Sequence, residues 1–153
     1  MDPLTRKALK HVQEAMREFL ALMSMEQPTE TQAVYNREKF QFLTNQFERA
    51  KSEAIPRALS HLTSASSLLD RTQGDLKKAI GAFEGMIRNQ ERMWVLAKMA
   101  DISDAKWKAE YRDCVMRNRR YSSDVDKYIA RASRRIGFTY DETGIHVEGE
   151  SFD

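Results

Sequence analysis

Residues 76–100 read LKKAIGAFEGMIRNQERMWVLAKMA, in which apolar side chains recur at spacings of four and three. This spacing is typical of an α-helix that is buried along one seam. A second apolar row makes the seam wider than the stripe of a two-stranded coiled coil, so the helix needs neighbours on more than one side. The segment therefore predicts a central member of a helical bundle. The seam consists of Leu76, Ile80, Phe83, Ile87, Gln90, Trp94 and Ala97, and the second row of Ala79, Ala82, Met86, Met93 and Leu96.

The composition agrees with a single domain of long helices. The chain has 153 residues, of which 41% are hydrophobic and 31% are charged, with six glycines and three prolines. This length is enough to bury a core without disulfides or metals. A high charge content with few helix breakers favours helices over strands.

Three other segments show the same helical periodicity. Asp2 and Pro3 form a good helix start before the apolar seam of the first segment. The last helix would be about 50 Å long at 1.5 Å per residue, which is too long for a compact globule of this size. We therefore expect an all-α fold over residues 1–137, an elongated four-helix bundle with coiled-coil-like packing. Its helices are predicted at about 3–25, 30–70, 75–100 and 102–136.

Two details of these helices are open at the level of the sequence. Pro56 interrupts the second helix and shifts its apolar face by one residue, which favours one kinked, continuous helix over two separate helices. Gly81 and Gly85 lie four residues apart on one face of the third helix. Each costs roughly 1 kcal/mol relative to alanine, so they indicate either the close approach of another helix or two tolerated, exposed glycines.

The end of the chain differs from the rest. Residues 138–147 alternate about a four-residue turn that ends at Gly144, a pattern that predicts a short β-hairpin or extended segment. A lone hairpin is marginal in water, so it must dock on the bundle or pair with another chain. Residues 148–153 are predicted to be a disordered acidic tail.

The sequence contains no motif for catalysis, a cofactor or a metal. His11, His61 and His146 lie on three separate segments, and no pair of His, Asp or Glu has the spacing of metal ligands. Cys114 is the one cysteine, so an intramolecular disulfide is excluded, and its place on a seam predicts a small buried side chain. We expect no enzyme activity, no cofactor and no metal.

The basic side chains of the last helix are the most function-like feature. Residues 102–137 carry ten Lys/Arg and five Asp/Glu, whereas residues 138–153 carry five acids and no Lys/Arg. Cations at helical spacing with tyrosines between them are typical of a surface that follows phosphates or an anionic membrane. The alternative is a solvated face neutralised by Asp124, Asp126 and the acidic tail. The candidate interaction residues are Arg117, Arg120, Tyr121, Lys127, Tyr128, Arg131, Arg134 and Arg135.

These features predict a non-catalytic helical interaction protein: a scaffold, an adaptor or a small subunit that binds partner proteins through its helix faces. The alternative is a protein that binds nucleic acid or an anionic surface through the basic helix, and a bundle enzyme ranks last. A homodimer is one form that the protein partnership can take. No apolar run is long enough to span a membrane, and a cytoplasmic location is expected, with the nucleus as the alternative.

Overall fold

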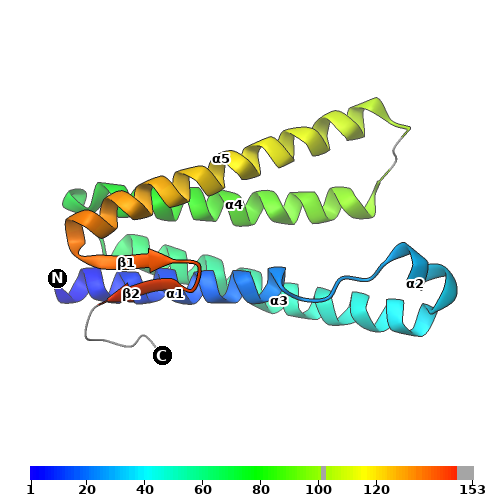
Figure 1. Ribbon diagram of the computed structural model, residues 1–153, viewed down its shortest axis with the longest axis horizontal. Helices are drawn as coiled ribbons and strands as arrows, with labels where there is room; N and C mark the ends of the chain where they lie inside the picture. The colour runs from blue at the N-terminus through cyan, green and yellow to red at the C-terminus, as the bar shows by residue number, and fades with distance from the viewer. Residues whose placement is uncertain (101–102, 148–153) are drawn as a thin grey trace.

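The structure is a computed structural model that describes residues 1–100 and 103–147. In this part of the chain, four long helices run along one axis, and a β-hairpin lies beside α1 toward one end (Figure 1). The prediction of an elongated all-α bundle with a short C-terminal hairpin is confirmed. The elements are α1 (Pro3–Met23), α2 (Glu30–Tyr35), α3 (Arg37–Ser67), a 3₁₀ turn (Arg71–Gln73), α4 (Gly74–Lys98), α5 (Ala105–Ile136), β1 (Phe138–Asp141) and β2 (Gly144–Val147).

The long helices pack mainly as two antiparallel pairs, α1 with α3 and α4 with α5. Asp2 starts α1 by accepting a hydrogen bond from the backbone amide of Thr5 at 2.9 Å. In the second pair, the side chain of Asn89 donates to the carbonyl of Cys114 at 2.7 Å, and the indole of Trp107 donates to the carbonyl of Leu96 at 2.9 Å. Such bonds fix the register of α5 on α4, because a shifted helix would leave buried polar groups unpaired.

The expected close approach of another helix is present at only one of the two α4 glycines. A Cβ atom on Gly85 would lie 2.5 Å from Cε1 of Tyr121, so the α5 ring occupies the space of the missing side chain. A Cβ atom on Gly81 would meet nothing within 4 Å. Gly85 therefore serves helix packing, whereas Gly81 is a tolerated glycine.

The bundle has four long helices along only part of its length. The ring of Phe19 on α1 meets that of Phe83 on α4 at 5.7 Å, and α1 ends one turn later at Met23. With 21 residues α1 is about 32 Å long, while the 32 residues of α5 span about 48 Å. We call the end with the β-hairpin the closed end. The open end, beyond α1, consists of α2 and of residues 37–49, 88–98 and 105–116 of the longer helices.

The predicted single helix over residues 30–70 is wrong at its start. Asn36 has φ −146° and ψ 72°, which ends α2 after six residues, and its side chain accepts from the amide of Lys39 to begin α3. The reason is that a short amide side chain competes with the helix for backbone hydrogen bonds. Other helix ends differ from the expected ones by a few residues: α1 ends at Met23, α4 ends at Lys98, and α5 begins at Ala105.

Helix α3 continues through Pro56 to Ser67, as the preferred prediction had it. A proline inside a helix costs about 3 kcal/mol. Around Pro56 the helix buries Ile55, Ala58 and Leu62, each no more than 4% exposed. Burial of one large aliphatic side chain contributes about 1.5–3 kcal/mol, so these contacts offset the cost of the proline.

The β-hairpin docks on the closed end. Gly137 adopts the left-handed conformation, φ 92°, and turns the chain from α5 into β1. The strands are antiparallel, with Phe138 opposite Val147 and Asp141 opposite Gly144. Phe138 is 4% exposed and Ile145 is fully buried, so the hairpin adds its apolar face to the bundle core. The predicted acidic tail, residues 148–153, lies outside the described residues.

Candidate functional site

The structure places the predicted basic residues on one long helix and leaves their charges in solvent. Among the described residues none of the six cations forms a salt bridge, so Asp124 and Asp126 do not neutralise them by ion pairing. The two tyrosines of the set are half-buried against α4. The exposed cations are Arg117, Arg120, Lys127, Arg131, Arg134 and Arg135, which we call the basic face of α5.

Tyr128 gathers cations from two helices. The nitrogen of Lys78 on α4 lies 5.5 Å from the ring centroid, that of Lys127 lies 5.2 Å away, and the guanidinium of Arg131 lies 5.6 Å away. Such contacts stabilise a cation by about 0.5–1 kcal/mol at exposed sites. Lys78 was absent from the predicted set because it belongs to α4, and its place beside Tyr128 depends on the antiparallel pairing. Tyr121 covers Gly85 instead and is a packing residue.

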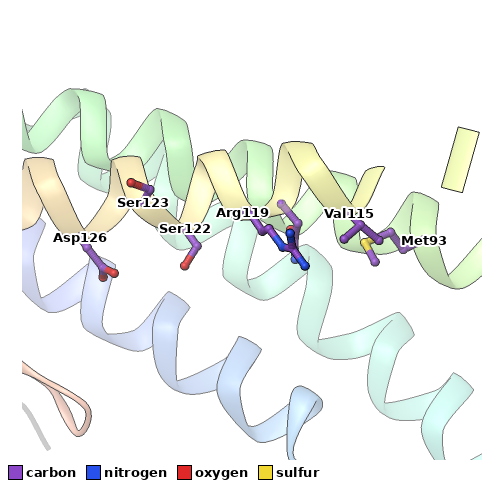
Figure 2. Close-up of a pocket in the computed structure, with 7 residues that line it drawn as sticks. Met93, Val115, Arg119, Ser122, Ser123 and Asp126 are labelled. Carbon is purple, nitrogen blue, oxygen red and sulfur yellow. The ribbon is translucent and has the colours of Figure 1, made fainter. Parts of the chain in front are cut away.

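A cavity lies beside α5 where α1 ends (Figure 2). Its volume is about 570 Å³. Figure 2 shows Ser122 and Asp126 on the side of α5 that faces α1, with Met93 of α4 at the far end of the row. The lining mixes apolar and polar groups and holds one cation, Arg119, and one acid. The lining residues are Met93, Val115, Asn118, Arg119, Ser122, Ser123 and Asp126.

An aromatic cavity of about 290 Å³ lies at the open end, between α3, α4 and the chain that follows α1. Phe47 and Trp94 form its wall, with ring centroids 5.1 Å apart and ring planes near perpendicular. The hydroxyl oxygen of Thr44 is buried there and has no hydrogen-bond partner among the described residues. At the rim Lys98 and Lys51 pair with Glu48, and the hydrogen bond from Lys98 holds the pKa of that carboxyl below its usual value.

The open end also exposes large apolar side chains. On α2, Val34 is 69% exposed and Tyr35 is 85% exposed, and on the first turns of α3, Phe42 is 63% exposed. None of the α2 residues is buried. The N-terminus of the helix is nevertheless capped by a full capping box between Thr29 and Gln32. Hydrogen bonds, rather than the burial of apolar side chains, therefore stabilise this helix.

Two histidines that the sequence separates by fifty residues meet at the closed end. The Nδ1 atoms of His11 on α1 and His61 on α3 lie 2.9 Å apart, so one ring donates to the other and at least one is neutral. Burial, and then the charge of His61, lower the pKa of His11. Two ligands do not make a metal site, and the described residues contain no group of three or more His, Cys, Asp or Glu that could hold a metal ion.

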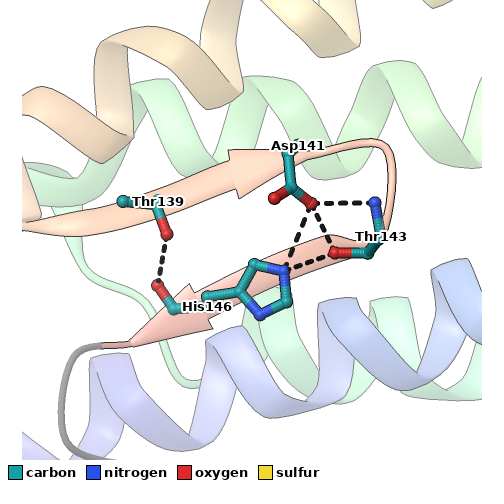
Figure 3. Close-up of polar contacts among 4 residues, drawn as sticks. All are labelled: Thr139, Asp141, Thr143 and His146. Carbon is teal, nitrogen blue, oxygen red and sulfur yellow. Dashed lines mark hydrogen bonds and ion pairs between the residues drawn. The ribbon is translucent and has the colours of Figure 1, made fainter.

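The hairpin turn contains an Asp, a Thr and a His in contact (Figure 3). Thr143 donates its amide to Oδ1 of Asp141 at 2.8 Å, and its hydroxyl lies 2.7 Å from Nε2 of His146. In a catalytic triad the acid binds one ring nitrogen of the histidine and the nucleophile the other. Here Asp141 and Thr143 both contact Nε2, so the cluster is the hydrogen-bonded closure of a turn. The bonds from Thr143 lower the pKa of Asp141.

In the described residues no helix combines the length and the apolar character that crossing a membrane requires. The absence of enzyme activity and the binding of partner proteins stay predictions. The chain matches no protein-family model, no curated protein and no solved structure.

Proposed function

We propose that this protein is a non-catalytic helical module that binds a helix of a partner protein along its open end. The observation that carries the proposal is the early end of α1 at Met23, while α3, α4 and α5 continue. An antiparallel bundle buries the apolar faces of its helices against three neighbours. Beyond Met23 one neighbour is missing, and a partner helix would supply it.

The side chains at this end support the proposal. Met93 and Val115 line the large cavity beside α5 and are only half-buried. Val95, Met99 and Met116 are 42%, 64% and 61% exposed. Flexible methionines and exposed aliphatic groups at i and i+4 spacing are typical of grooves that accept amphipathic helices. The cavity beside Met93 and Val115 gives the partner's side chains a place to insert.

Site-specific crosslinking tests this proposal. A photoreactive phenylalanine at position 115 should crosslink to a discrete partner, while the same group at position 113, an exposed position on another side of α5, should not. Val115→Glu, examined with the photoreactive group at position 93, should abolish the adduct, since a buried carboxylate is costly in an apolar interface. The mass of the adduct distinguishes a second copy of this chain from a different protein.

Equal crosslinking from positions 113 and 115 would contradict the proposal, because contact would then not depend on the face of α5 that carries the cavity. Light scattering of the purified chain provides an independent measurement. A dimer that Val115→Glu converts to a monomer would identify self-association as the use of this surface, and a monomer would leave the groove for another chain.

The basic face of α5 supports a second candidate function, binding of nucleic acid or another polyanion. The supporting observation is that its cations have no ion-pair partner among the described residues, while Lys78 adds a further charge beside Tyr128. Phosphate contacts release counterions, so binding to a short DNA duplex should weaken steeply with added salt.

A triple charge reversal at Arg120, Arg131 and Arg134 should abolish DNA binding. The matched control reverses Arg37, Lys39 and Arg49, which are exposed cations on α3. If both triple variants lose the same affinity, the effect comes from net charge and the basic face has no specific role. Affinity that is unchanged between low and physiological salt would refute this candidate.

A further inference from the structure

A third cavity lies toward the closed end and borders the cavity beside α5, with which it shares Ser122 and Asp126. It has a volume of about 350 Å³ and is enclosed by α1, α4, α5 and the β-hairpin. This volume falls within the range of small-molecule sites, about 300–1,000 Å³. Its floor is apolar: Met16, Phe19, Phe83 and Val125 are all no more than 6% exposed. The rings of Phe19 and Phe83 meet edge to face.

The rim of this cavity is acidic. Three carboxylates line it, Asp126 from α5 and Asp141 and Glu142 from the hairpin, and no Lys or Arg is among the lining residues. Tyr140 is half-buried beside Asp126, and burial followed by the Asp126 charge raises the pKa of Tyr140. In the turn, Thr143 donates its amide and its hydroxyl to Asp141. The rim therefore presents a negative potential over an apolar floor.

We propose that this cavity binds a small organic ammonium ion. The apolar body of the ligand lies against Phe19 and Phe83, and its nitrogen lies at the acidic rim. An anion would be repelled by three carboxylates, and a neutral apolar molecule would leave their potential unused. A metal ion would gain nothing from an aromatic floor, whereas an ammonium group is attracted both by carboxylates and by aromatic faces. The proposal does not rest on the helix-binding function, although Ser122 and Asp126 line both cavities.

Three matched probes test the proposal: 3-phenylpropylammonium, 3-phenylpropanol and 3-phenylpropionate. They share a ring and a three-carbon chain and differ in charge. The full chain is labelled with ¹³C at its methionine methyl groups, because Met16 and Met86 line the cavity, whereas Met99 and Met116 are 64% and 61% exposed at the open end. The ammonium should shift Met16 and Met86 saturably, and the alcohol should bind about tenfold more weakly or worse.

Asp126→Asn should weaken ammonium binding about tenfold, since it removes one rim charge and keeps the size of the side chain, and Glu142→Gln should act in the same direction. Asp113→Asn, an exposed acid elsewhere on α5, is the control and should leave affinity unchanged. Circular dichroism establishes that each variant is folded. Equal binding of the three probes, shifts confined to Met99 and Met116, or no shift at millimolar ammonium would each overturn the proposal.

Discussion

The closed end and the open end are built from the same helices but differ in what they bury. At the closed end Leu9, Ile129 and Ile145 are fully buried. At the open end Tyr35 and Phe42 are 85% and 63% exposed, although Leu43 and Leu96 are buried there. The difference follows from the length of α1 and the position of the hairpin (Figure 1). An amphipathic pattern thus makes a helix, but a neighbouring element decides whether its apolar face becomes core.

The largest expected effect compares two residues of α5. Ile129→Ala at the closed end should lower the free energy of unfolding by about 2–5 kcal/mol, because it opens a cavity in a fully packed site. Met116→Ala at the open end removes a side chain that is 61% exposed, so the free energy of unfolding should change by less than about 0.5 kcal/mol. Urea denaturation of both variants measures the difference. Similar losses would mean that the two ends are equally well packed.

A smaller effect concerns two glycines. Gly137→Ala forces a side chain into the left-handed conformation that leads to the hairpin, at a cost of about 1–2 kcal/mol. Gly81→Ala places a methyl group in open space beside α4. Because alanine favours the helix, the free energy of unfolding should instead rise by up to about 1 kcal/mol. Thermal denaturation should therefore give shifts of opposite sign. A loss of stability in both variants would show that Gly81 has a neighbour.

The pH dependence of stability tests the contact between α1 and α3. The pKa of His11 is lowered in the folded protein, first by burial and then by His61, Lys7 and Lys10, while Glu14 opposes the shift. Below its unfolded value of about 6.5 the unfolded chain then binds more protons than the folded one, so stability falls as pH falls from about 7 toward 5. His11→Gln should flatten this slope in urea midpoints taken across the range. An identical slope in the variant would exclude His11 as its source.

The smallest effect is expected at the open end, where Lys98 of α4 pairs with Glu48 of α3. The two side chains are 58% and 36% exposed, so Lys98→Gln should lower the free energy of unfolding by less than about 1 kcal/mol. Lys51 remains 3.1 Å from Glu48 and keeps it partly paired. The loss should disappear at about 1 M salt, where the Debye length is only about 3 Å. A loss that persists in salt would indicate packing by the Lys98 stem.

The long helices and the hairpin could be predicted because their signals are local. The seam from Leu76 through Ile87 depends only on residues of one helix, and the turn at Gly144 depends only on residues of one hairpin. The break at Asn36 could not be predicted from the pattern, because an asparagine can also stand inside a helix. There the outcome depends on one amide side chain that caps α3.

The functional surfaces divide in the same way. Exposure of the basic face could be predicted, since charged residues off the seam of a helix turn to solvent. Lys78 beside Tyr128 and the contact between His11 and His61 could not, because each needs two helices in a known register. The acidic cavity needs four elements at once. The sequence identifies the groups, and only the packing brings them together.

The docking of the hairpin on α1 has a consequence for the order of folding. Each antiparallel helix pair joins segments that are near in sequence, so it forms after a short loop closes. Strand β2, in contrast, lies against α1, with Gly144 close to Gln13 and more than a hundred residues of chain between them. Closing so long a loop is entropically costly and slow. We therefore expect a transient species with both helix pairs formed and the hairpin undocked, in which the acidic cavity does not yet exist.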